Sequence, residues 1–161
     1  MRRVALALSL VLASISSCGA ESDIIGQASV IDGDTIVIHG THIRLWGIDA
    51  PESGQTCTDY MSIKYLCGQR AAFVLADMLD GKTVVCHDNG RDMYGRTLAH
   101  CFAGGQDIQA AMVRQGWALA FRKYSLEYVG EEKEAIDTRA GMWSGEFIEP
   151  WRWRHDKQAK D

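Results

Sequence analysis

The fold is decided by one stretch, residues 25–48, which reads IGQASVIDGDTIVIHGTHIRLWGI. Residues 25–31 and 36–39 are rich in β-branched side chains, which favour strands. Asp32-Gly33-Asp34 between them is typical of a hairpin turn. Gly40-Thr41 marks a second turn, after which residues 42–48 form a third predicted strand. The stretch therefore predicts three consecutive strands.

The chain beyond this stretch adds predicted helices and two further strands. Apolar residues at i, i+3, i+4 and i+7 predict a helix over residues 68–79. Strands are predicted at residues 82–87 and 97–102, around a turn at 92–95. Further helices are predicted over residues 107–115 and 125–140, each closed by a glycine.

The order of these elements predicts a mainly β fold with α-helices. Five strands with a helix between the third and fourth match a five-stranded OB-fold barrel carrying three helices. An open α+β sheet gives the same order. Residues 49–67 have no clear period and are predicted to form a long loop, which in a compact domain is usually functional or mobile.

Composition places the chain among folded, single-domain proteins. Its 161 residues suit one domain, and 47% hydrophobic with 24% charged residues excludes a disordered chain. The net charge of -4 argues against a protein that coats nucleic acid or an anionic membrane by bulk charge.

The first twenty residues have the pattern of a signal peptide. Arg2 and Arg3 precede an apolar run over residues 4–15, which is shorter than the ~20 residues that span a membrane. No other segment is long or apolar enough to span one. Cys18 ends a sequence that resembles a bacterial lipobox, and cleavage after Ala20 is the alternative. Either way we expect an exported protein, periplasmic or secreted, with or without a lipid anchor at Cys18.

Four cysteines remain after this signal, and strand geometry tests their pairing. If Cys86 lies opposite Cys101, then His87 lies opposite His100, and adjacent residues point to opposite faces of the sheet. The four side chains cannot converge on zinc, so the pattern predicts a Cys86–Cys101 disulfide. Cys57 and Cys67 are left as a second pair, which would close the long loop.

The mature chain is predicted to consist of one folded domain, residues 24–146, and a C-terminal tail, residues 147–161. The tail contains Trp-Arg-Trp-Arg-His at residues 151–155, which mixes aromatic rings with cations. Such a mixture can bind nucleic acid. We instead interpret the tryptophan rings as docking onto the domain.

Three short segments carry the polar groups that suit hydrolysis of a phosphodiester. Asp34 and Asp49 offer oxygen ligands to a hard cation, Ca²⁺ or Mg²⁺. Glu52 can accept a proton from water. Arg44 and Arg96 can hold a phosphate and neutralise the charge that grows in the transition state.

The same segments resemble the thermonuclease family, the staphylococcal nuclease-like proteins. The resemblance runs from about residue 25 to 143. The matching segments are Asp32-Gly33-Asp34-Thr35, residues 44–52, residues 92–96, and Val113-Arg114-Gln115-Gly116 with Ala118. It implies an OB-fold barrel and a monomeric endonuclease that cuts DNA and RNA with little sequence preference and leaves 3′-phosphates.

The resemblance also implies roles for single residues. Asp34, Asp49 and the carbonyl of Ala50 would bind Ca²⁺, which is favoured over Mg²⁺. Arg44 and Arg96 would hold the scissile phosphate, and Glu52 would be the general base. Tyr94 and Tyr124 match positions that line the nucleotide pocket, where Met93 replaces a basic residue and Arg122 a tyrosine.

A second hypothesis is a catalytically inactive OB-fold module that binds nucleic acid or protein. An inactive copy is expected to have lost at least one of the five charged site residues, and none is missing.

Overall fold

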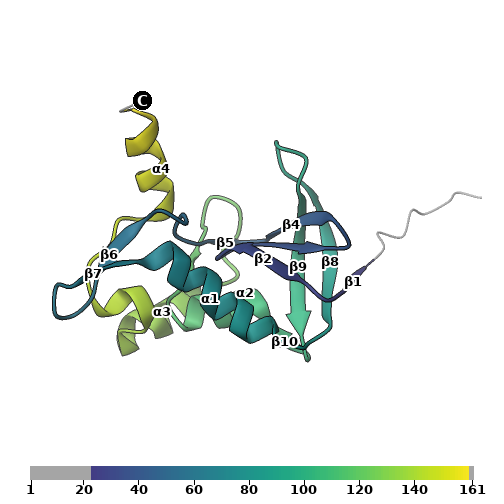
Figure 1. The fold of residues 1–161 in the computed structure, drawn as a ribbon, viewed down its shortest axis with the longest axis horizontal. Coiled ribbons are helices and arrows are strands. Elements are labelled where there is room, and N and C mark those ends of the chain that lie inside the picture. Colours follow the sequence, from purple (N-terminus) through teal and green to yellow (C-terminus); the bar gives the residue numbers. More distant parts are fainter. Residues whose placement is uncertain (1–22, 160–161) are drawn as a thin grey trace, which may run out of the picture.

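The computed structural model describes residues 23–159, so the predicted signal peptide lies outside the described residues. Its main unit is a seven-stranded sheet in the order β1-β8-β9-β4-β3-β2, with β10 beside β9 (Figure 1). The strands of this sheet are β1 (Ile24–Gly26), β2 (Ser29–Asp32), β3 (Thr35–Ile38), β4 (Thr41–Leu45), β8 (Val84–Arg91), β9 (Thr97–Ala103) and β10 (Gln106–Asp107).

The ends of this sheet are joined by a very short connection. β1 pairs with β8 at one end and β2 pairs with β3 at the other, yet only residues 27–28 separate β1 from β2. The sheet must therefore curl back toward itself, which gives the OB-fold-like shape that was predicted. The predicted strand over residues 25–31 is split at this corner, because its two halves pair with different partners.

The long loop predicted over residues 49–67 contains short strands. β5 (Ile48–Asp49) pairs with β11 (Leu119–Ala120), and β6 (Thr56–Thr58) forms a hairpin with β7 (Lys64–Leu66). These pairs are too short to produce a recognisable alternation in the sequence. They fix the segment that follows the third predicted strand against the helical part of the molecule.

The helices agree with the prediction except at the C-terminus. α1 (Cys67–Leu79) buries Cys67, Ala71 and Leu75 at four-residue spacing, as an amphipathic helix does. α2 (Ile108–Arg114) and α3 (Val129–Thr138) follow, then a 3-10 turn, η1 (Gly141–Ser144). Among residues 23–159 no helix has the length and apolar character needed to cross a bilayer.

A fourth helix, α4 (Pro150–Gln158), lies in the segment expected to be a tail, and it projects from the rest of the fold (Figure 1). Pro150 occupies its first turn, where a proline costs no hydrogen bond. Trp151 stacks on Phe121, with ring centroids 5.6 Å apart, so the expected docking of this tryptophan is confirmed.

Helix α2 is fixed to the sheet through a buried amide. The Gln109 side chain donates to the Ala99 carbonyl at 2.9 Å and accepts from the Cys101 N–H at 3.2 Å. Asp107 caps the helix by accepting from the Ala110 N–H at 2.8 Å. The central strand β9 is therefore held by its neighbouring strands and by a helix.

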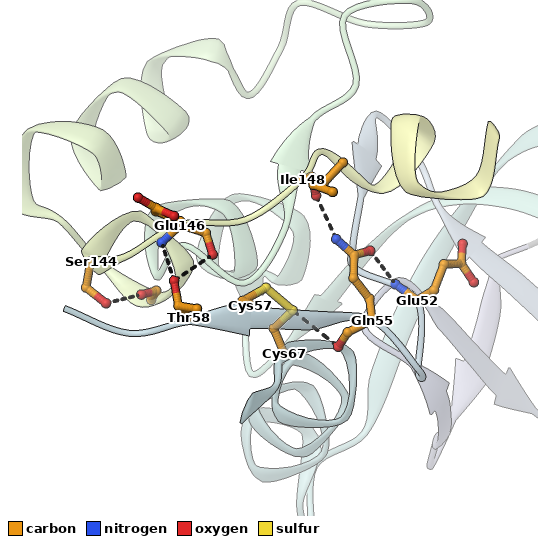
Figure 2. The surroundings of a disulfide bond; sticks show 9 residues. Glu52, Gln55, Cys57, Thr58, Cys67, Ser144, Glu146 and Ile148 are labelled. Atoms are coloured by element: carbon orange, nitrogen blue, oxygen red, sulfur yellow. Dashed lines mark hydrogen bonds between the residues drawn. A yellow bond between two sulfur atoms is a disulfide. The ribbon is translucent and has the colours of Figure 1, made fainter. Parts of the chain in front are cut away.

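Both predicted disulfides are present. Cys86 lies directly opposite Cys101, and His87 opposite His100, which is the register that the sequence argument required. The β8–β9 register shifts only nearer the hairpin tip, between Asp88 and Arg91. The second bond joins Cys57 to Cys67, so it links β6 to the start of α1 (Figure 2).

The pairing predicts the number of free thiols. Mature protein that is denatured without reductant should have at most one thiol that reacts with a thiol reagent. Reduction should expose four more reactive thiols. Four free thiols before reduction would contradict both bonds. The bonds close segments of 10 and 15 residues, so each should stabilise the fold by ~2–3 kcal/mol.

Candidate active site

The predicted polar segments meet at one pocket of about 550 Å³. The β2–β3 turn, β4, the loop after β5 and the β8–β9 hairpin tip all contribute to its walls, and so does α4. Its charged lining residues are Asp32, Asp34, Arg44, Glu52, Arg91, Asp92, Arg96 and Arg154. The fold thus brings together segments that are separate in the sequence.

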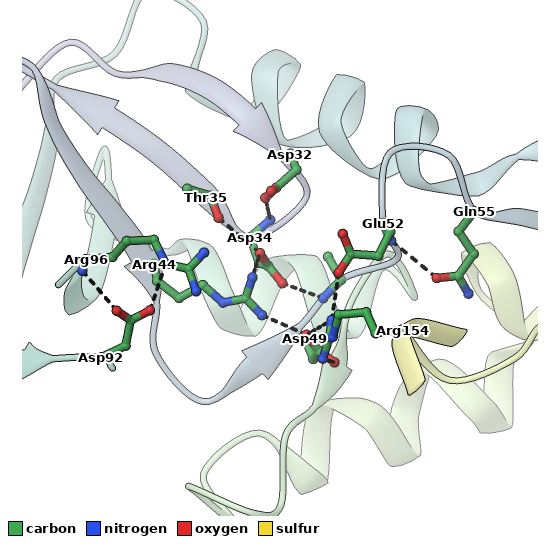
Figure 3. Close-up of polar contacts among 11 residues, drawn as sticks. Asp32, Asp34, Thr35, Arg44, Asp49, Glu52, Gln55, Asp92, Arg96 and Arg154 are labelled. Carbon is green, nitrogen blue, oxygen red and sulfur yellow. Dashed lines mark hydrogen bonds and ion pairs between the residues drawn. The ribbon is translucent and has the colours of Figure 1, made fainter. Parts of the chain in front are cut away.

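Two carboxylates at this site are almost completely buried, Asp34 in the pocket lining and Asp49 beside it. Asp34 follows β2 in the hairpin turn and is 2% exposed, while Asp49 ends β5 and is 0% exposed. The Ala50 N–H donates to Asp34 Oδ2 at 2.7 Å, which connects the two segments (Figure 3). Burial raises the pKa of Asp34 well above its usual range, although Arg44 acts in the opposite direction.

Arg44 lies between these carboxylates and contacts both (Figure 3). It is on β4 opposite Thr35, so the strand register places it beside the Asp34 turn. One guanidinium nitrogen donates to Asp34, and the other donates to Asp49 Oδ1 at 2.7 Å. Burial alone would lower the pKa of Arg44, but the two carboxylates raise it, so the arginine stays charged.

Glu52 lies on the loop after β5, and its backbone is fixed by a buried glutamine. The Gln55 side chain accepts from the Glu52 N–H at 3.3 Å and donates to the Ile148 carbonyl at 2.6 Å (Figure 2). The Gln55 N–H donates to the Glu52 carbonyl at 2.7 Å. Gly68 in α1 passes so close that a Cβ there would lie 1.8 Å from the Glu52 carbonyl oxygen. The loop is therefore held from both sides.

Arg96 lies at the β8–β9 hairpin tip and is held by Asp92. Its Nε donates to Asp92 Oδ2 at 2.7 Å, and its backbone N–H donates to Asp92 Oδ1 at 2.9 Å. Burial acts to raise the pKa of Asp92, but these hydrogen bonds outweigh it and lower the pKa. Arg96 stays one-third exposed at the pocket, with nitrogens still free to bind an anion.

Two of the three expected substrate-binding residues line the pocket. Tyr94 and Tyr124 are both more than half exposed there, beside Trp46 and Met93. Arg122 does not line it, because its guanidinium pairs with Glu132 at 2.6 Å.

Arg154 is a site residue that the sequence analysis did not assign. It comes from α4 and donates to Asp49 Oδ2 and Glu52 Oε1, each at 2.8 Å (Figure 3). The Trp-Arg-Trp-Arg-His segment stands out in the sequence because it mixes aromatic rings with cations. No periodicity or motif, however, predicts that residue 154 lies beside residue 49. Gln55 was likewise missed, since a lone glutamine in a loop carries no distinctive signal.

The donor set of the site fits a hard cation. By formal charge, the four carboxylates of Asp32, Asp34, Asp49 and Glu52 face the two guanidinium groups of Arg44 and Arg154. Arg96 is balanced by Asp92, and Arg91 by Asp88. Buried carboxylates with excess negative charge attract a cation, and oxygen ligands suit Ca²⁺ or Mg²⁺. Within residues 23–159 no three His, Cys, Asp or Glu side chains gather as a metal cluster.

The fold and the pocket define an OB-fold-like protein with a buried carboxylate and guanidinium site, and comparison with known proteins agrees. Residues 42–145 match the family model described as staphylococcal nuclease homologue. The chain belongs to this family.

Individual relatives cover most of the chain. A succinoglycan biosynthesis protein, ExoI, of Rhizobium meliloti (strain 1021) is 39% identical over 78% of this chain and 67% of its own. A micrococcal nuclease of Shigella flexneri is 36% identical over 96% of this chain and 91% of its own. An uncharacterized endonuclease of Haemophilus influenzae is 31% identical over 94% of this chain and 84% of its own.

The buried Arg44–Asp34 contact leads to a stability prediction. Arg44→Met leaves the Asp34 carboxylate buried without its partner, which should lower the free energy of unfolding by about 3–5 kcal/mol near neutral pH. Arg44 lowers the pKa of Asp34, so the folded variant without it binds the Asp34 proton more readily than the folded wild type does. The loss should therefore shrink as the pH falls through the pKa of Asp34 in the folded variant.

Urea denaturation at neutral and mildly acidic pH measures this loss. The double variant Arg44→Met/Asp34→Asn is the control and should recover part of the lost stability, because it removes the unpaired charge. An equal loss at both pH values would contradict the assignment to Asp34.

Proposed function

We propose that this protein is a nuclease that uses Ca²⁺ to hydrolyse phosphodiester bonds in DNA and RNA, with little sequence preference, leaving 3′-phosphates. The observation that carries the proposal is the contact of Arg44 with both Asp34 and Asp49, beside a pocket that Glu52 and Arg96 also line. Relatives named micrococcal nuclease and endonuclease support a hydrolytic nuclease.

The cation would be held by Asp34, Asp49 and the Ala50 carbonyl. When bound, it polarises a phosphoryl oxygen and reduces the negative charge that an attacking water meets. Ca²⁺ fits better than Mg²⁺, because Ca²⁺ tolerates irregular coordination by carboxylates and backbone carbonyls.

The side chains around the proposed cation position bind the phosphate, accept a proton and stack on a base. Arg44 and Arg96 donate hydrogen bonds to the phosphate oxygens and stabilise the charge that grows on them. Glu52 accepts a proton from the attacking water. Tyr94 and Tyr124 offer exposed ring faces on which a base can stack. Arg122 is not among the proposed substrate contacts, because it is bound to Glu132.

The cellular setting follows from the leader and the cysteines. We propose that residues 1–20 direct export to the periplasm or the cell exterior, and that the mature protein acts as a monomer. The two disulfides support this, since such bonds persist in oxidising compartments.

A cleavage assay tests the activity. Mature protein is incubated with single-stranded DNA or RNA, in Ca²⁺ or in excess chelator. We expect both substrates to be cut only with the cation, to 5′-hydroxyl fragments that a polynucleotide kinase labels without prior phosphatase treatment. No cleavage by the wild type in Ca²⁺ would favour the inactive binding module.

Arg96→Ala should reduce kcat by ~10²-fold or more, because it removes a donor to the phosphate in the transition state. Arg114→Ala is the matched control: its guanidinium pairs with Glu131 and Glu134, outside the pocket lining, so its activity should equal the wild type. Equal cleavage by Arg96→Ala would indicate a contaminant or another site.

Cation binding has an independent thermal readout. A cation that binds only the folded state raises the free energy of unfolding by ~2.7 kcal/mol at 100 times its Kd. Ca²⁺ should therefore raise the Tm of the wild type and of Asp80→Asn, an exposed control at the end of α1. Asp34→Asn should lose this increase, and a full increase in that variant would exclude Asp34 as a ligand.

A further inference from the structure

The C-terminal helix places an arginine against the two carboxylates that the proposed function uses most directly. The Arg154 guanidinium spans them as a fork. Nη2 donates to Asp49 Oδ2 at 2.8 Å, while Nη1 donates to Asp49 Oδ1 at 3.1 Å and to Glu52 Oε1 at 2.8 Å (Figure 3). Bidentate contacts of this kind fix orientation as well as supplying attraction.

This contact differs from an ordinary surface ion pair. Asp49 is completely buried, and Arg154 is only one-third exposed. Arg152, two residues earlier on the same helix, is 68% exposed and pairs with Glu149, the residue just before the helix. The chain therefore contains a matched pair of arginines, one directed into the pocket and one into solvent.

The segment around α4 also holds the Glu52 loop by a second route. The Ile148 carbonyl, two residues before α4, accepts from Gln55, whose side-chain oxygen accepts from the Glu52 N–H. Trp151 stacks on Phe121, another lining residue of the pocket. Both the backbone and the carboxylate of Glu52 are thus connected to the same C-terminal segment.

We propose that Arg154 is a positioning residue of the active site, through which helix α4 holds the carboxylates of Glu52 and Asp49 in place. This inference rests on the proposed nuclease function. A glutamate on a loop samples several rotamers, and a general base must lie within hydrogen-bond reach of the water that it deprotonates. Arg154 restricts Glu52 to one arrangement while Gln55 fixes its backbone.

The same geometry opposes cation binding. Arg154 donates to both oxygens of Asp49, so its positive charge lies beside a proposed cation ligand. Removing that charge should tighten Ca²⁺ binding while it slows hydrolysis. A residue that merely stabilised the fold would not change these two properties in opposite directions.

The test compares Arg154→Gln, Arg154→Lys, Arg154→Ala and Arg152→Gln in the mature protein, with single-stranded DNA as substrate. Arg154→Gln should lower kcat by ~10–100-fold, the usual effect of losing a residue that orients a functional ligand, with KM unchanged. Arg154→Lys should retain part of the activity, and Arg152→Gln all of it. Methylguanidinium added to Arg154→Ala should restore part of the lost rate.

Calorimetric titration with Ca²⁺ provides the readout that does not depend on turnover. Arg154→Gln should bind Ca²⁺ with a lower Kd than the wild type, and Arg152→Gln with the wild-type Kd. Tryptophan fluorescence and thermal melts check that Trp151 remains docked in each variant.

The outcomes separate this inference from the proposed function. A wild type that does not cleave overturns the function and, with it, the role of Arg154. If the wild type cleaves and Arg154→Gln has the same kcat as the wild type, only the role of Arg154 is overturned. The role is also overturned if neither lysine nor methylguanidinium restores activity, or if Arg154→Gln binds Ca²⁺ more weakly.

Discussion

The burial of Asp34 and Asp49 is the constraint on which the rest of the site depends. A buried carboxylate is unfavourable unless it is hydrogen-bonded and paired. Arg44 supplies the pairing for both residues, and the Ala50 N–H adds a hydrogen bond to Asp34. The β2–β3 turn, β4 and β5 are therefore held together by charge at the point where the curled sheet opens into the pocket.

This compensation is incomplete, which favours the cation binding that we propose. Burial keeps the pKa of Asp34 raised despite Arg44, so the negative charge is under-stabilised in the folded protein. A fully paired carboxylate gains little from a new ligand, whereas an under-stabilised one would gain from the proposed cation. The site thus combines buried carboxylates with Arg96 and exposed aromatic rings in the pocket lining.

The sequence was sufficient for those features that depend on local pattern or on strand register. The Asp32-Gly33-Asp34 turn, the spacing along α1 and the antiparallel register that places Cys86 opposite Cys101 and His87 opposite His100 are all of this kind. The polar groups of three short segments indicated Arg44, Asp49, Glu52 and Arg96, and the family resemblance agreed. Three of these residues line one pocket, and Asp49 contacts Arg44 beside it. The split between β1 and β2 was missed because one β-branched run serves two pairing partners. Arg154 was missed because its contacts to Asp49 cross 105 positions of the chain.

That separation has a consequence for the order in which the molecule is completed during synthesis. The sheet requires the chain as far as β9, because β1 pairs with β8 and β4 with β9. Pairing over such sequence distances slows folding, since each loop must close before its contacts form. The ion pairs of Arg154 come later still, because residue 154 lies near the end of the polypeptide. A chain truncated before α4 can already have all its sheet strands, but its buried Asp49 has only Arg44 as a guanidinium partner.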